Sequence, residues 1–182
     1  MKRALLIVLA GAGLASCATE GPSGPVPPPP PPPPSEQPPA NPNAFRPQDF
    51  AWSTVPGRAS IQGVMAYKAG AVRYTCQGSD VILTPETPWS RRRMTILYGS
   101  AVSAAVPVST VRARTPSAPS GDYQTFVRKA SCDASSRFSF GGLPDGAWYV
   151  ITLAKPMGPA GEAVAVMRRV ETHGGPKAVL LN

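Results

Sequence analysis

Few side chains in this sequence could carry catalysis, and they do not form a recognisable catalytic motif. The 182 residues include one histidine, His173, which stands beside Gly174-Gly175, where we expect an exposed turn. Ser100 follows Tyr98-Gly99, but that segment lacks the second glycine of a nucleophile elbow. Carboxylates are sparse, and several occupy turn-like positions where aspartate forms local hydrogen bonds. We therefore expect no enzyme activity, no metal site and no cofactor.

The first of the three cysteines stands at the end of a secretory signal. A basic start precedes residues 4–14, an uncharged and mostly apolar stretch that is too short to span a membrane. Leu14-Ala15-Ser16-Cys17 resembles the lipobox of bacterial lipoproteins, in which the cysteine is lipidated and cleavage occurs just before it. The resemblance implies a signal peptide over residues 1–16 and a lipid anchor on Cys17; the alternative is an ordinary signal peptide. In Gram-negative lipoproteins, Ala18 in place of aspartate resembles an outer-membrane sorting context.

The two other cysteines, Cys76 and Cys132, form an even number if Cys17 carries the anchor. An export compartment is oxidising, so paired cysteines there are expected to form disulfides. We predict a Cys76–Cys132 disulfide. The alternative is two buried free thiols that pack as small apolar side chains.

Residues 17–44 are dominated by proline and predict an extended linker. Pro27 to Pro34 is an unbroken run, which removes backbone donors and favours a polyproline II rod over a packed core. We interpret the linker as a spacer between the membrane and the domain that follows. The alternative is a docking segment for an aromatic groove on another protein.

Residues 45–182 have the pattern of an all-β domain. Apolar and polar residues alternate with period two in several segments, and Gly/Pro turns separate them. Ala147 to Leu153 is nearly apolar throughout, which predicts a strand covered on both faces. A short helix is expected only within Thr95 to Ala105. Strands are predicted at or near residues 61–67, 72–76, 80–84, 123–132, 137–140, 147–153, 164–170 and 178–181.

One segment of this domain resembles a known family. Phe138-Ser139-Phe140, followed by Leu143-Pro144-Asp145-Gly146 and an aromatic strand, is similar to the signature of carboxypeptidase regulatory-like domains. The resemblance implies a transthyretin-like Greek-key β-sandwich of about seven strands, usually a non-catalytic accessory. Ser135-Ser136 departs from the family, which often has a glycine there, and residues 98–122 match nothing in it.

The domain is strongly basic. From Ala44 onward it has 16 Lys and Arg residues against 8 Asp and Glu residues, a net charge of about +8. Arg91, Arg92 and Arg93 are consecutive, so they cannot all lie on one exposed face of a strand, and we expect a loop or an exposed edge. Such a run protects a sheet edge from pairing, or it contacts anionic headgroups or an acidic partner. Because the chain is exported, we expect no nucleic-acid partner.

Two functions follow from these features. The first is a lipid-anchored, non-enzymatic protein of the cell envelope, in the outer membrane, whose sandwich has a binding or structural role. Its partners would be the membrane, through the anchor, and an envelope protein or an anionic envelope polymer. The alternative is a lipoprotein of a type VI secretion machine, since such lipoproteins also carry a transthyretin-like sandwich behind a lipidated cysteine.

Overall fold

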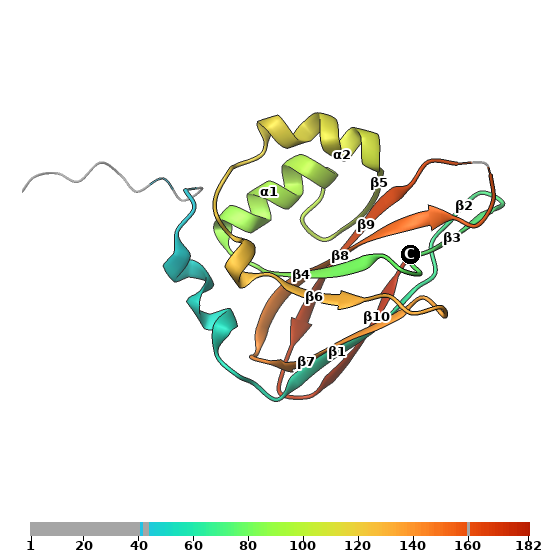
Figure 1. Ribbon diagram of the computed structural model, residues 1–182. Helices are drawn as coiled ribbons and strands as arrows, with labels where there is room; N and C mark the ends of the chain where they lie inside the picture. The colour runs from blue at the N-terminus through green and yellow to red at the C-terminus, as the bar shows by residue number, and fades with distance from the viewer. Residues whose placement is uncertain (1–40, 42–43, 160) are drawn as a thin grey trace, which may run out of the picture. The chain divides into compact units, whose positions relative to one another are not determined.

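Two β-sheets of unequal size face each other across an apolar core in the computed structural model of this protein (Figure 1). The structure describes residue 41 and residues 44–159 and 161–182. The predicted signal peptide, Cys17 and nearly all of the proline-rich linker lie outside these residues. The smaller sheet contains, in order, β10 (Pro176–Leu181), β1 (Ala59–Met65) and β7 (Arg137–Leu143).

The larger sheet is built around one long strand, β8 (Gly146–Pro156). Its C-terminal end pairs with a hairpin of β2 (Lys68–Ala69) and β3 (Val72–Thr75). The order of the remaining strands is β6 (Arg128–Ser131), β4 (Asp80–Pro85), β8, β9 (Val164–Thr172) and β5 (Ser103–Pro107).

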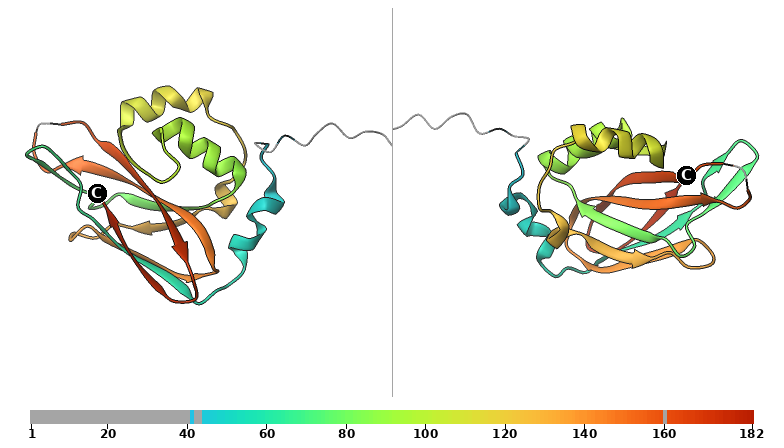
Figure 2. Two further views of the ribbon diagram at one scale, coloured as in Figure 1. Left: turned by 180° about the vertical axis from the view of Figure 1, so that it is seen from behind. Right: turned by 45° about the horizontal axis from the view of Figure 1, so that its top comes forward.

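Helices lie on the face of the larger sheet that points away from the smaller one. The views in Figure 2 agree that α1 (Pro88–Tyr98) and α2 (Val108–Arg114) lie together over this face. Three short 3-10 helices complete the regular structure, η1 (Pro47–Thr54), η2 (Thr115–Ser117) and η3 (Gln124–Phe126). Among the described residues, no helix is long and apolar enough to cross a membrane.

The strand pattern explains how both faces of the larger sheet are buried. Trp148 and Val150 of β8 point into the core between the sheets, whereas Tyr149 and the partly buried Ile151 pack against the helices. Because successive side chains on a strand point to opposite faces, a strand buried on both sides must be apolar throughout. The prediction that Ala147 to Leu153 is covered on both faces is confirmed, except that Leu153 is 43% exposed.

The paired phenylalanines of β7 are also placed as the alternation predicts. Phe138 and Phe140 are both 6% exposed and lie in the core, with ring centroids 6.1 Å apart. Gly63 of β1 is opposite Phe138 in the register. A Cβ at Gly63 would collide with the Phe138 ring, so the aromatic side chain occupies the space that glycine leaves.

The all-β sandwich is confirmed, with differences in its parts. The described residues contain ten strands, whereas the resemblance implied about seven and the sequence pattern eight. The two strands that the pattern missed are the two-residue β2 and the short β5, whose residues show no clear alternation. The segment predicted as a strand from Tyr123 begins as η3 and becomes β6 only at Arg128. The helix expected within Thr95 to Ala105 is wrong, since α1 ends at Tyr98 and β5 starts at Ser103.

Helix α1 begins at residues that are typical of a helix start. Thr87 caps it: its Oγ1 accepts from the Ser90 backbone N–H at 3.1 Å, and the Ser90 hydroxyl accepts from the Thr87 N–H at 2.8 Å. Pro88 occupies the first turn, where a missing N–H costs nothing. At the other end Gly99 has a φ of 75° and closes the helix in the left-handed conformation. Pro88 therefore starts a helix here instead of marking a loop.

The Cys76–Cys132 disulfide prediction is confirmed. The two Cα atoms are 5.7 Å apart, and both residues are buried. The bridge joins the chain just after β3 to the chain just after β6. Backbone hydrogen bonds from Gly78 N–H to Cys132 O and from Cys132 N–H to Ser79 O hold the same two segments together.

Candidate functional site

The three consecutive arginines lie on α1, so the prediction of a loop or a strand edge is wrong. Residues on a helix are about 100° apart, and the three side chains therefore point in three directions. Arg91 pairs with Glu86. Arg93 donates to Pro119 O at 2.7 Å and stacks over Trp89 and Tyr123. Arg92 is exposed and forms no hydrogen bond or ion pair within the part of the chain that the structure describes. Two of the three side chains are thus held by the protein itself.

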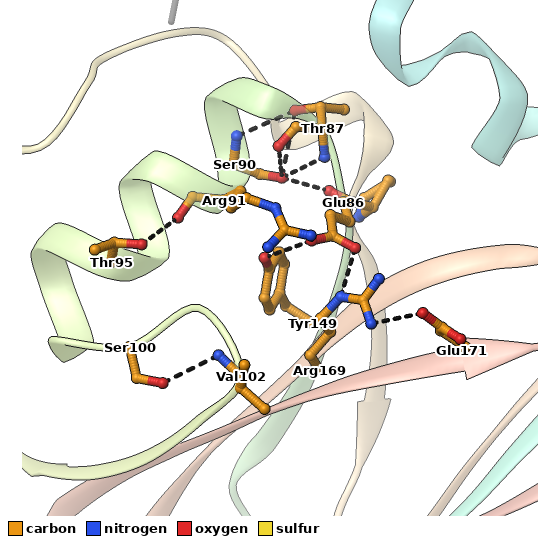
Figure 3. A network of polar contacts seen from close by, with 11 residues as sticks. Glu86, Thr87, Ser90, Arg91, Thr95, Ser100, Val102, Tyr149, Arg169 and Glu171 are labelled. Atoms are coloured by element: carbon orange, nitrogen blue, oxygen red, sulfur yellow. Dashed lines mark hydrogen bonds and ion pairs between the residues drawn. The ribbon is translucent and has the colours of Figure 1, made fainter.

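Glu86, at the end of β4, is the centre of a polar cluster that Figure 3 shows. Its side chain is 9% exposed. One carboxylate oxygen accepts from the Tyr149 hydroxyl at 3.0 Å and pairs with Arg91, and the other accepts from Arg169 Nε at 2.6 Å. Arg169 continues to Glu171, with Nη1 2.6 Å from Oε1. These five residues, the Glu86 cluster, join the first turn of α1 to β8 and β9.

The electrostatics of the Glu86 cluster fit a structural role. Burial and the adjacent Glu86 carboxylate raise the pKa of Tyr149, so the phenol stays protonated and donates. Burial works against the charge of Arg169, but hydrogen bonds to Glu171 and Glu86 raise its pKa overall. The hydrogen bond from Arg169 lowers the pKa of Glu171. Both oxygens of the Glu86 carboxylate are already bound by guanidinium groups or the phenol, so this cluster holds α1 on the sheet.

The serine and histidine considered for catalysis have separate partners. The Ser100 hydroxyl oxygen accepts from Val102 N–H at 3.1 Å, and His173 Nε2 lies 3.8 Å from Glu171 Oε2 in the exposed β9–β10 turn. No group of three or more His, Cys, Asp or Glu side chains suited to a metal is found over residues 44–159 and 161–182.

A groove of about 540 Å³ lies on the helix-covered face of the larger sheet. The helices stop short of the C-terminal half of β8 and leave Leu153 partly uncovered. Ile82 of β4 and Ile151 and Leu153 of β8 form an aliphatic floor. We call this feature the outer groove.

Helix α2 forms the wall of the outer groove. Val108, Val111 and Arg112 line it, and their i, i+3 and i+4 spacing places them on one helix face. The Ser109 backbone N–H donates to Glu162 Oε1 at 2.8 Å, which fixes the first turn of α2 and lowers the pKa of Glu162. Arg114 donates to Leu97 O at 3.1 Å and so ties α2 to the end of α1.

Three charged side chains also line the outer groove. They are Asp80, Arg112 and Lys155, one acid and two bases. All three are exposed, and none of them forms an ion pair with any other described residue. The groove therefore combines an aliphatic floor with polar groups that are available to a ligand.

Two further polar groups of the outer groove have no protein partner. Tyr98 is 8% exposed as a residue, and its hydroxyl oxygen, which forms no hydrogen bond within residues 44–159 and 161–182, is still accessible to solvent. Burial raises its pKa to about 12, so it stays a hydrogen-bond donor at neutral pH. Ser79 also lines the groove and is 6% exposed, and its buried Oγ has no hydrogen-bond partner in the described structure. A buried polar atom without a partner, such as Ser79 Oγ, is uncommon in folded proteins.

Tyr98 also lines a smaller adjoining cavity of about 120 Å³. Tyr123, Gln124 and Arg93 contribute to that cavity, and Ile82 and Ile151 are shared with the outer groove. The two hollows therefore have a common boundary at Tyr98 on the same face of the sheet. None of the outer-groove residues was singled out from the sequence as a binding residue, because only the fold brings residues of α2, β4 and β8 to one groove.

The sequence matches no known protein family and no curated protein. The fold is similar to a solved structure from Pseudomonas aeruginosa, that of a protein described as a candidate carbohydrate-binding protein. The two align with a TM-score of 0.55 and 23% identity, over 75% of this chain and 96% of the other. At this identity the likeness shows the fold alone, an all-β sandwich with a few helices.

Proposed function

We propose that this chain is a lipid-anchored, non-enzymatic protein of the cell envelope whose sandwich binds a saccharide of that envelope. The lipobox-like Leu14 to Cys17 segment supports the anchor, and Ala18 in place of aspartate supports an outer-membrane location. The resemblance of Phe138 to Val150 to carboxypeptidase regulatory-like domains supports an accessory role without catalysis.

The observation that carries the binding role is the outer groove. Saccharide sites need a flat apolar surface for the C–H face of a sugar ring and several hydrogen-bonding groups around it. The outer groove has the floor of Ile82, Ile151 and Leu153 and the polar groups of Tyr98 and Asp80. The description of the Pseudomonas protein with a similar fold agrees with this proposal.

The experiment compares the full-length chain with Cys17→Ser in intact cells. Each is crosslinked, isolated through a tag, and analysed for membrane fractionation and for the sugar composition of co-purified polymer. We expect the full-length chain in the membrane fraction with bound saccharide, and Cys17→Ser released or left unprocessed. Unchanged fractionation and processing of Cys17→Ser would overturn the anchor.

The captured material tests the binding role in the same experiment. Envelope saccharide above the level of an unrelated lipoprotein supports the proposal, whereas its absence contradicts it. Capture of a secretion-machine component in place of saccharide would favour the alternative of a type VI secretion lipoprotein.

A further inference from the structure

The charges around the outer groove indicate which class of saccharide it accepts. Arg112 of α2 and Lys155 of β8 both line the groove, and neither forms an ion pair in the described structure. Arg112 is near enough to Glu162 to contribute to the lowered pKa of that carboxyl, but it does not form an ion pair with it, unlike Arg91 and Arg169 with Glu86. Two unpaired cations beside one aliphatic floor are complementary to an anionic ligand.

We propose that the outer groove binds an acidic saccharide, one whose sugar units carry carboxylates. This inference rests on the proposed function and assigns it a site and a ligand class. Arg112 and Lys155 bind the carboxylate groups, and Leu153 and Ile151 pack against the C–H face of a sugar ring. Charge-assisted hydrogen bonds of this kind are about twice as strong as neutral ones, so the cations set the preference for an acidic ligand.

The polar groups of the outer groove give a second argument. The Tyr98 hydroxyl is a donor with no protein acceptor in the described structure, and its oxygen remains accessible to solvent although the rest of the residue is buried. A sugar hydroxyl in the groove supplies that acceptor, and Asp80 accepts hydrogen bonds from neighbouring sugar hydroxyls. A purely aliphatic ligand such as an acyl chain would cover the Tyr98 hydroxyl and Asp80 without offering them partners, and desolvating these two groups would disfavour its binding.

The charge of the whole domain favours the same class of ligand. The chain from Ala44 onward has a net charge of about +8, which attracts anionic polymers and raises their association rate at low salt. The groove is open at the surface and has a volume within the range of small-ligand sites. A short segment of a longer polymer can therefore lie in it while the rest of the polymer continues outside.

The test is calorimetric titration of the full-length chain, purified in detergent, with tetragalacturonate and with its methyl ester. The ester keeps the ring hydroxyls but removes the carboxylate charges. We expect the acid to bind about tenfold more tightly than the ester and its affinity to fall with added salt. Equal affinity for the acid and the ester would overturn the inference.

Variants locate the binding. The double variant Arg112→Gln with Lys155→Gln should bind the acid about tenfold or more weakly and should bind the ester with unchanged affinity. The control, Arg58→Gln with Lys177→Gln, removes the same charge beside and within the smaller sheet, and should bind as the wild type does. Tyr98→Phe should lower the affinity for the acid and for the ester by the same factor. Wild-type affinity in the Arg112/Lys155 variant would overturn the inference even where the acid binds.

The outcomes separate this inference from the proposed function. If neutral maltotetraose or cellotetraose binds while the acid does not, the saccharide role stands and the acidic preference fails. If no saccharide binds, the proposed function fails as well. Binding of dodecanoate alone, lost in Leu153→Asn, would assign the groove to an acyl chain and overturn both.

Discussion

At the scale of single residues, the buried carboxylate of Glu86 decides how the helical layer is attached. Its side chain is 9% exposed and is neutralised by Arg91 and Arg169, whose side chains are 52% and 25% exposed. Tyr149, buried beneath it, donates a further hydrogen bond. A buried charge is costly unless it is both paired and hydrogen-bonded, and Glu86 has both kinds of partner.

Glu86→Gln should therefore lower the free energy of unfolding by about 2 kcal/mol, because hydrogen bonds to a charged group contribute roughly 1.5–3 kcal/mol each and the arginines are partly rehydrated. Urea unfolding followed by circular dichroism measures the change. Glu171→Gln, in which the altered side chain is half exposed, is the matched control and should change stability far less. Equal effects of the two substitutions would show that Glu86 is no more important than a surface carboxylate.

The presence of three consecutive arginines in the sequence does not indicate what each side chain contacts in the fold. The sequence shows three adjacent basic residues and predicts an exposed run, but only Arg92 is exposed without a partner in the described structure. Arg93 reaches Pro119 O, 26 residues away along the chain, only through the fold, and such a contact carries no local signal in the sequence. Arg91 pairs with the nearby Glu86, but Glu86 is also bound by Tyr149 of β8 and Arg169 of β9, which are distant in the sequence.

At the scale of elements, strands with clear alternation were predictable and the helical layer was not. Stretches of β1, β4, β7 and β9 bury either every second side chain or several in succession. The sequence patterns of these strands therefore indicate which residues lie in the core. The start of α1 did have a local signal in the sequence. Thr87 is the N-cap, Pro88 is in the first turn, and Ser90 is the capping partner of Thr87. The run Arg91 to Arg93 was nevertheless expected on a loop or an exposed edge, which was wrong.

The cap of α1 can be tested by itself. Thr87→Ala removes the side chain that accepts from the Ser90 N–H and should cost about 1 kcal/mol of unfolding free energy. Thr87→Ser keeps the acceptor and should restore most of that loss. Thr95→Ala, on the exposed side of the same helix, is the control and should be nearly neutral. A loss in Thr87→Ser as large as in Thr87→Ala would mean that the methyl group of Thr87, and not its capping oxygen, stabilises the helix.

At the scale of the whole molecule, one covalent link encloses the helical layer. The chain between Cys76 and Cys132 contains β4, both α-helices, β5 and η3, and thus both α2, the wall of the outer groove, and Tyr98. This link was predictable because it follows from cysteine number and compartment, without any knowledge of the fold. The outer groove was not predictable, because its residues come from two helices and three strands, and no sequence pattern indicates that these elements lie side by side.

Removing the disulfide should therefore affect both stability and the groove. Closing a loop of this length removes conformational entropy from the unfolded chain, worth about 4 kcal/mol in the chain-entropy model and commonly about 2–4 kcal/mol in practice. Cys76→Ala with Cys132→Ala should lower the unfolding free energy by that amount and bring unfolding by urea to a lower midpoint. The matched comparison is the wild type in reductant and urea, which should converge on the double variant once the bridge is reduced. Because both cysteines are buried, reductant without urea should leave the bridge intact in the native state, as mass analysis of alkylated protein would show.

Rapid reduction of the native protein would mean that the segment around Cys76 and Ser79 opens locally. In that case, saccharide binding in the outer groove should slow the reduction.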